Sequence, residues 1–186
     1  MSLQRWQETL IVAQGDGTQL SNSAVAASIL PAQAKLTIPA NYFGDIGKQI
    51  RVNAIGRLSN VVTTPGTLTL DLRLGGTVVF NSGAMQLSTT AHTNVPWWWQ
   101  VMLTLRAVGS SANFMGQSMF FSQAANVSGA DLTQSHAHLM APNTAPAVGS
   151  NFDATLTNQL DLFAAFSVAT NPTNLTLHQF NVESLN

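Results

Sequence analysis

The residues of this chain whose types could do chemistry are a few carboxylates and imidazoles. Asp71 and Asp161 lie in segments that alternate apolar and polar residues, and a pair of carboxylates is what glycoside hydrolysis requires. Both stand on the polar side of their segments, so we expect solvated strand faces there. The chain has no Gly-x-Ser-x-Gly elbow, phosphate-binding loop, dinucleotide fingerprint or His-Glu-x-x-His motif. We therefore predict a protein without catalytic residues, cofactor or small-molecule substrate.

The segment His136-Ala137-His138 is the one pattern in the sequence that resembles a metal-binding motif. Residues i and i+2 of an extended segment point the same way, so the two imidazoles could hold an ion together with Asp131 or His92. The sequence offers no further pair of ligands at a defined spacing. An ordinary polar loop explains the segment more simply, and we predict no bound metal.

Three consecutive tryptophans, Trp97-Trp98-Trp99, carry more information. Neighbouring side chains of a strand point to opposite faces, so Trp97 and Trp99 can share a core that Trp98 cannot. Three interpretations of Trp98 stay open. It could pack under a loop or another strand, it could contact another subunit, where aromatic side chains are enriched, or it could stack on a sugar ring. Trp98 is the candidate interface residue of the chain.

Strands must position these residues, because the dominant periodicity of the sequence is two. Apolar and polar residues alternate in 67–74, and Gly75-Gly76 then turns the chain into a partner segment at 77–80, which predicts an antiparallel hairpin. The same alternation predicts strands at 50–58, 95–106, 113–122, 160–168 and 175–185.

Some positions depart from this alternation. Ile55-Gly56 interrupts the strand at 50–58 and predicts either a bulge or a close approach of two backbones. The apolar phase of the last strand slips near His178-Gln179, which predicts a bulge there. Helical pattern is limited to one turn around 39–43. Residues 123–151 have no sustained pattern, so we expect a long excursion over the surface.

The predicted fold class is all-β, an antiparallel two-sheet sandwich with a jelly-roll-like arrangement. Short strands without a repeat period fit two packed sheets better than a propeller or a solenoid. At 186 residues the chain is expected to form a single β-sandwich domain, residues 1–186. Residues 1–30 could be an N-terminal arm that reaches a neighbour or the first strand of the same domain.

The composition limits the partners that the chain can have. Charged residues make up 8% of the chain, against about 25% in an ordinary soluble domain, and Ser, Thr, Asn and Gln fill the polar positions. A net charge of -1 offers no cationic field for nucleic acid or anionic lipid. No segment has the pattern of a signal peptide or a membrane span, and without Cys there are no disulfides. The uncharged surface favours association.

Four stretches carry a resemblance: WQETLI at 6–11, GRLSNVVTTPGTLTLD at 56–71, GSSANFMG at 109–116 and LHQFNVESLN at 177–186. Together they resemble a family of tailed-bacteriophage virion structural proteins, and the similarity spans nearly the whole chain. The resemblance lies in strands and turns, not in a catalytic signature. It implies a small β-sandwich protein on the particle, such as a head decoration or cement protein on the capsid lattice, often a trimer. No binding residues carry over.

The residues and the resemblance together predict a non-enzymatic phage virion structural protein that decorates the assembled head and stabilises it by binding. The expected partners are the major capsid protein of the phage head and copies of the chain itself, as a homotrimer. The expected location is the capsid surface of the virion, after assembly in the host cytoplasm. The alternative is a receptor- or glycan-binding module of a head or tail fibre, and a polysaccharide hydrolase is the third hypothesis.

Overall fold

The computed structural model describes residues 7–61, 64–125, 138–145 and 147–186. Nearly all regular structure in these ranges is β-strand, as predicted. Two 3-10 turns of three residues each, η1 (Ala32–Ala34) and η2 (Gly109–Ser111), are the helical elements there. Within the same ranges, no helix is long and apolar enough to cross a bilayer.

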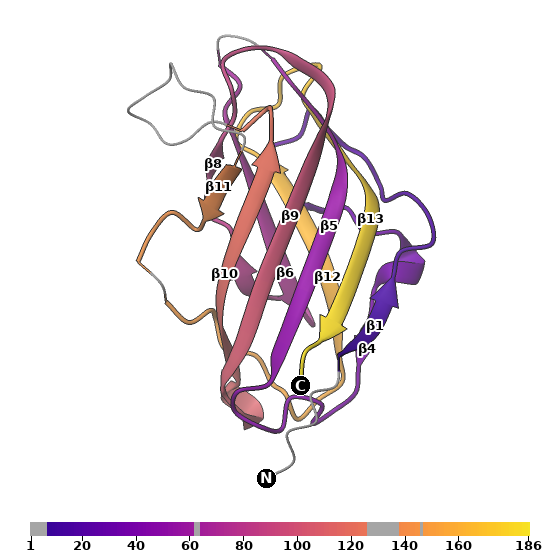
Figure 1. Cartoon of the computed structure of the whole chain (residues 1–186), viewed down its shortest axis with the longest axis vertical. Coiled ribbons are helices and arrows are strands. Elements are labelled where there is room, and N and C mark those ends of the chain that lie inside the picture. The colour runs from indigo at the N-terminus through magenta and orange to yellow at the C-terminus, as the bar shows by residue number, and fades with distance from the viewer. Residues whose placement is uncertain (1–6, 62–63, 126–137, 146) are drawn as a thin grey trace.

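The first sheet has seven strands, and its neighbouring strands are antiparallel. Along its main path lie β1 (Glu8–Val12), β13 (Asn174–Ser184), β5 (Gln49–Asn60), β9 (His92–Ala107), β10 (Asn113–Ser122) and β11 (His138–Ala141). The short strand β2 (Leu20–Ser21) pairs with β13 beside this path. The four long strands of this sheet cover the front of the molecule in Figure 1.

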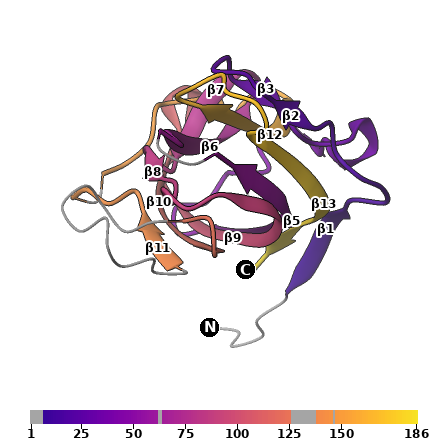
Figure 2. The ribbon, with the colours of Figure 1, turned by 90° about the horizontal axis from the view of Figure 1, so that it is seen from above.

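The second sheet has six strands. Its main path is β3 (Ala27–Ser28), β12 (Asn158–Phe166), β6 (Thr67–Leu74) and β7 (Thr77–Asn81). Two further strands flank it, since β4 (Thr37–Ile38) pairs with β12 and β8 (Met85–Gln86) pairs with β6. Seen from above, the two sheets face each other across the core (Figure 2).

The strand pairs are nested in the manner of a jelly roll. The hairpin β6·β7 is innermost, β5·β9 encloses it, β3·β12 encloses both, and β1·β13 is outermost. Successive pairs alternate between the two sheets, so the chain rolls up as one long folded hairpin. β10 and β11 extend the first sheet beyond β9. The predicted all-β, jelly-roll-like sandwich is confirmed.

The core lies between the inner faces of the two sheets. Every second residue of β6, from Leu68 to Leu74, is buried, and so are Phe114 and Phe120 of β10. Most predicted strands are present with bounds that differ by a few residues, and β10 has the predicted bounds. Burial of these alternating side chains is what holds the sandwich closed in a chain that has no Cys.

The predicted irregularities have clear outcomes. The register of β13 against β5 shifts between Leu177 and Gln179, which confirms the bulge at His178. At Gly56 the structure selects the close approach, because a Cβ there would stand 1.9 Å from the Thr176 carbonyl oxygen. The bulge lies on the opposite strand, and Ile55 keeps the alternation as an outward residue.

One expectation about the loops was wrong, and another was right only in part, because residues 142–145 and 147–151 lie at the surface whereas earlier residues of 123–151 pack on the sandwich. Residues 39–43 form a hydrogen-bonded turn, not a helical one, with Asn41 at a positive φ of 62°. In the described part of 123–151, β11 pairs with β10, and Ala124 and Ala125 are buried. These residues lack a two-residue pattern because short, edge-located pairing needs little alternating apolar surface.

Residues 7–30 take part in both sheets. β1 and β2 pair with β13, and β3 pairs with β12. Ile29 and Leu30, which follow β3, are buried in the core. Ala13 and Gly17 add backbone hydrogen bonds to β13, through the carbonyl oxygens of Phe180 and Leu177.

Candidate contact face

Trp98 lies on the outer face of the first sheet. Its neighbours Trp97 and Trp99 are buried, as predicted, whereas Trp98 is 40% exposed. The alternation of β9 imposes this arrangement, because one residue of three consecutive tryptophans must face away from the core. No loop or strand of the described residues therefore covers Trp98 in the way that the first interpretation required.

The cross-strand neighbours of Trp98 are also large and apolar. Ile55 of β5 and Phe121 of β10 stand opposite Trp98 in the sheet register. The Phe121 ring stacks on the indole with centroids 5.2 Å apart and planes at 19°. Ile55 is 38% exposed. The three residues form an apolar ladder across β5, β9 and β10 that sequence analysis did not find, since Ile55 was taken as an interruption of its strand.

A shallow hollow of about 290 Å³ opens beside this ladder. Its lining is mostly apolar and consists of Ile55, Pro96, Trp97, Trp98, Phe121, Ser122 and Gln123. Side-chain hydroxyls and amides are few in this lining. The hollow is therefore suited to an aliphatic or aromatic side chain more than to a sugar, whose hydroxyl groups need convergent hydrogen-bonding groups.

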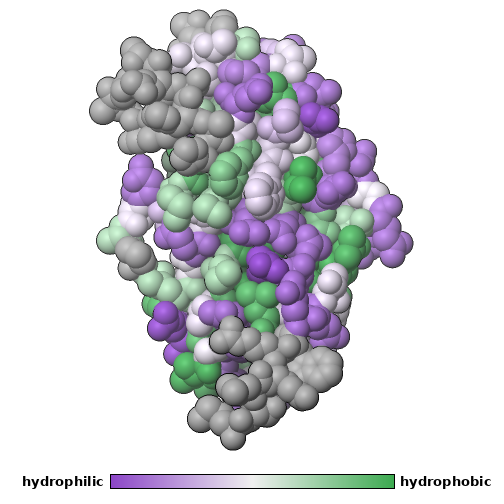
Figure 3. Space-filling view, viewed as in Figure 1, coloured by the Kyte–Doolittle hydropathy of each residue, from purple (hydrophilic) through white to green (hydrophobic). Residues whose placement is uncertain are grey.

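Around the ladder, the outer face of the first sheet mixes polar and apolar residues, as the interspersed green and purple areas of Figure 3 show. Gln100 Nε2 donates to Asn53 Oδ1 at 2.7 Å, and Met102 is exposed. Arg57, two residues from Ile55 on the same face, is exposed too. We call Ile55, Arg57, Trp98 and Phe121, with the hollow beside them, the contact face.

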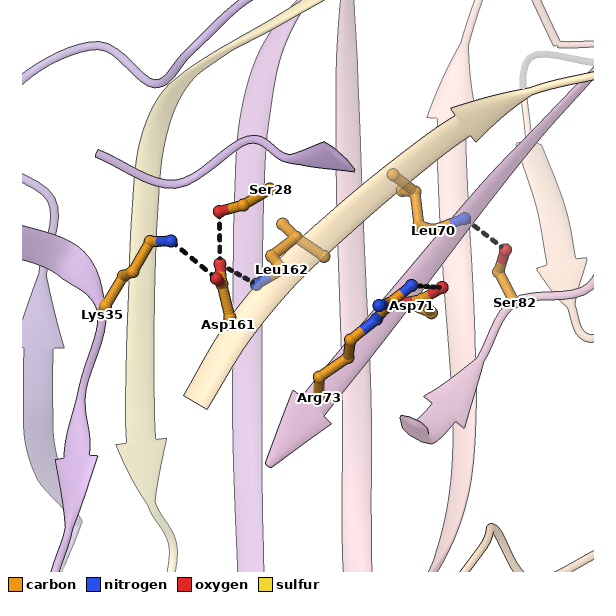
Figure 4. Close-up of polar contacts among 8 residues, drawn as sticks. All are labelled: Ser28, Lys35, Leu70, Asp71, Arg73, Ser82, Asp161 and Leu162. Atoms are coloured by element: carbon orange, nitrogen blue, oxygen red, sulfur yellow. Dashed lines mark hydrogen bonds and ion pairs between the residues drawn. The ribbon is translucent and has the colours of Figure 1, made fainter. Parts of the chain in front are cut away.

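The two carboxylates suggested for hydrolysis, Asp161 and Asp71, lie in the second sheet and form ion pairs with basic side chains. Asp161 accepts hydrogen bonds from Lys35 Nζ and Ser28 Oγ, each at 2.7 Å, and from the Leu162 N–H at 2.8 Å. Its side chain is only 13% exposed. Figure 4 shows these contacts between β12 and the segment around β3. The expectation of a solvated strand face was wrong for Asp161, because Ser28 and Lys35, from the segment that pairs with the edge of β12, reach its carboxylate.

Asp71 is likewise mostly buried and accepts a hydrogen bond from Arg73 Nε at 2.7 Å (Figure 4). The Arg73 guanidinium also lies 3.7 Å from the centre of the Phe163 ring. The hydrogen bond that Arg73 donates to Asp71, assisted by the charges of Asp71 and Asp161, raises the pKa of Arg73 above its ordinary value. These contacts keep both carboxylates engaged with cations.

The proposed metal ligands are not brought together in the part of the chain that can be described. Asp131 and His136 lie outside the described residues, and so does the side chain of His138. His92 has its Nδ1 2.8 Å from the Thr90 carbonyl oxygen and 3.2 Å from Asn60 Oδ1. Among the described residues, no three His, Asp or Glu side chains are grouped to hold a metal ion.

A second hollow, of about 460 Å³, lies at the edge of the sandwich between the turn after β7 and the segment after β11. Its lining is uncharged and includes Phe80, Asn81, Gly116, Asn143 and Thr144. Asn81 Oδ1 accepts a hydrogen bond from the Gly83 N–H at 2.7 Å, which orients the amide. This hollow offers more polar groups than the one beside Trp98.

No protein-family model matches the chain, and no curated protein matches it. Among solved structures, the chain is similar to the CBM2 module of the evolved Dit of Lactobacillus casei BL23 phage J-1. The TM-score is 0.36 and the sequence identity 10%, over 99% of this chain and 98% of that one. A likeness at this level transfers no ligand, partner or function. The resemblance to phage virion structural proteins stays a prediction.

Proposed function

We propose that this chain is a non-catalytic structural protein of a bacteriophage particle, which assembles with copies of itself and decorates the assembled capsid. The observation that carries the proposal is the contact face. Aromatic side chains, Trp above all, and Arg are among the residues most enriched at the centres of protein interfaces. A stacked Trp98–Phe121 pair beside an apolar hollow is thus better suited to a protein partner than to water.

The electrostatics support the same proposal. Three of the six described Lys and Arg residues form ion pairs within the chain: Lys35 with Asp161, Arg51 with Glu183, and Arg73 with Asp71. These pairs need no partner from another protein when a surface is covered, and Arg57 is the charged residue of the contact face that would need one. Asp71 and Asp161 each form one of these ion pairs. This structural role accounts for both carboxylates without a catalytic function.

The proposal is tested on purified virions of a phage that encodes the chain. Mass spectrometry of the particles should find the protein in tens to hundreds of copies, because a decoration protein follows the capsid lattice. Particles that carry Trp98→Ala should retain fewer copies after a salt and dilution wash. A protein that is absent from wild-type particles would overturn the proposal.

A glycan-binding module is the second candidate function, and the edge hollow is the observation that favours it. Sugar hydroxyls need neutral donors and acceptors, and Asn81, Asn143 and Thr144 supply them around Phe80. If the chain binds glycans, binding on a glycan array should be lost in Asn143→Ala and retained in Trp98→Ala. The reverse result would place the sugar on the Trp98 face.

A further inference from the structure

The turn before β5 presents a carboxylate beside an exposed aliphatic side chain. Ile46 is 67% exposed and Asp45 is exposed as well. Among the described residues, no cation lies within 4 Å of the Asp45 carboxylate. Lys48 is engaged elsewhere, because its Nζ donates to the Tyr42 carbonyl oxygen and stands 3.6 Å from the centre of that ring. We call Asp45 and Ile46 the tip.

The contact face carries the opposite charge beside its apolar hollow. Arg57 is exposed and has no ion-pair partner in the described part of the chain. Its cross-strand neighbours, Thr176 and Pro96, are uncharged. Arg51, on the same strand and face, is by contrast bonded to the cross-strand Glu183 at 2.6 Å. If another surface covers Arg57, the guanidinium becomes a buried unpaired charge unless that surface supplies a hydrogen-bond acceptor.

The tip has the chemistry that this face needs. Of the described carboxylates, only Glu8 and Asp45 have no hydrogen-bonding or ionic partner. Glu8 lies between Gln7 and Thr9, whereas Asp45 is followed directly by an exposed isoleucine. An apolar side chain beside an anion on the tip thus matches an apolar hollow beside a cation on the contact face.

The tip and the contact face of one molecule cannot meet. The tip precedes Gln49, the first residue of β5, whereas the hollow lies beside Ile55, about 20 Å further along the strand at its usual rise. In Figure 1, β5 begins at the lower end of the sheet, near the C-terminus. Asn186 Nδ2 donates to the Gly47 carbonyl oxygen at 3.0 Å and holds the turn at that end.

We propose that the tip of one copy docks on the contact face of the next, with Ile46 in the hollow and Asp45 paired with Arg57. The inference rests on the proposed function in one respect, that the contact face is a protein interface. Two different surfaces meet in such a contact, so repeated docking forms a closed ring or an open chain of copies. A ring of three would be the trimer that the resemblance to phage virion proteins leads us to expect.

Cysteine cross-linking tests the contact without background, because the chain has no Cys of its own. Ile46→Cys protein is mixed with Ile55→Cys protein that carries a size tag, under mild oxidation. The mixture should give a disulfide-linked pair of the two proteins. Leu156→Cys replaces Ile46→Cys as the control, since Leu156 is similarly exposed but is not followed or preceded by an unpaired carboxylate. A chain that carries both cysteines should form disulfide-linked oligomers of increasing size. The largest of these oligomers gives the number of copies in a closed ring.

Charge exchange tests the ion pair by sedimentation of the full chain. Arg57→Asp and Asp45→Arg should each weaken self-association on the order of tenfold or more, and the double variant should recover most of the loss. Arg106→Asp is the matched control, because Arg106 is an exposed arginine of the same sheet without an ion-pair partner among the described residues. Circular dichroism checks that each variant keeps its β-sheet signal.

Each outcome decides between the ideas. A wild-type protein that stays monomeric at every concentration overturns the inference, and so does an oligomer that is indifferent to Arg57→Asp and Ile46→Ala. A cross-link that forms equally well with Leu156→Cys overturns it as well. An oligomer that behaves as expected, together with absence of the protein from virions, leaves the inference standing and overturns only the proposed function.

Discussion

At the scale of single residues, Gly56 explains how three strands fit around the buried Trp97. A Cβ at Gly56 would stand 1.9 Å from the Thr176 carbonyl oxygen and 2.8 Å from Trp97 Nε1. Without that Cβ, the indole N–H donates to the carbonyl oxygens of Arg57 and Thr176, at 3.2 and 3.3 Å. A buried N–H without an acceptor would cost free energy, so the glycine keeps the indole satisfied.

Gly56→Ala is therefore expected to lower the free energy of unfolding by about 2 kcal/mol, because the methyl group would overlap a backbone oxygen of β13. Urea unfolding followed by tryptophan fluorescence measures the change. Gly15→Ala is the matched control, since a Cβ there would meet only Gln33 Nε2, at 3.4 Å. Equal losses in the two variants would contradict the argument.

The raised pKa of Arg73 has a defined consequence for the dependence of stability on pH. A pKa that is higher in the folded state means that the fold favours the protonated guanidinium. This contribution is fully present below the ordinary arginine pKa and is lost only as the pH rises through the folded-state value. The Arg73 contribution to the free energy of unfolding should therefore stay constant across the neutral pH range.

Asp71→Ala should consequently lower the free energy of unfolding by about 1–3 kcal/mol, by the same amount at about pH 6 and pH 9. Urea unfolding of the variant and of the wild-type chain at several pH values measures this. Glu8→Ala is the control, because Glu8 has no partner among the described residues. A decrease in the free energy of unfolding that appears only at alkaline pH would contradict this account of the Asp71–Arg73 contact.

At the scale of elements, Asp161 joins the segment from β3 to η1 onto β12. Its carboxylate accepts from Ser28, which is part of β3, and from Lys35, which follows η1. β3 itself has only two residues, so its backbone pairing with β12 is short. The side-chain contacts therefore carry much of the attachment of this segment to the second sheet.

Asp161→Ala should lower the free energy of unfolding by about 2 kcal/mol, since one substitution removes an ion pair and two hydrogen bonds of a mostly buried carboxylate. It should also speed hydrogen exchange at the Ile29 amide, which donates to the Leu162 carbonyl oxygen. Asp16→Ala is the comparison, because the Asp16–His178 pair is exposed and pairs of that kind contribute little. Similar effects of the two changes would contradict the assignment.

At the scale of the whole molecule, the nesting of strand pairs makes the two ends of the chain depend on each other. β1 and β13 form the outermost pair of strands, and β3 pairs with β12, the strand that precedes β13. Removal of residues 1–30 should therefore abolish cooperative unfolding, because it uncovers the edges of β13 and β12 and removes the buried Ile29 and Leu30. A truncated chain that melts as sharply as the full chain would show that these residues are dispensable.

The alternation of residue types by itself determined the strands and the fold class. A period of two assigns each residue to one face of a sheet, and this is a local property of the chain. It was enough to predict that Trp97 and Trp99 can share the core, that Trp98 faces away from them, and that β13 has a bulge near His178-Gln179. These outcomes needed no knowledge of which strands are neighbours.

Only the tertiary structure decided what lies next to what. Ile55 and Phe121 are 66 positions apart in the sequence, and the register of three strands places both beside Trp98. Asp161 looked solvated because its alternation shows only which face it is on, whereas its burial depends on side chains of a neighbouring segment, Ser28 and Lys35, that bond to it. The separation between the tip and the contact face likewise follows from the length and direction of β5. Neighbours across strands are set by pairing and register, which are long-range properties, and so the site could not be assembled from local pattern alone.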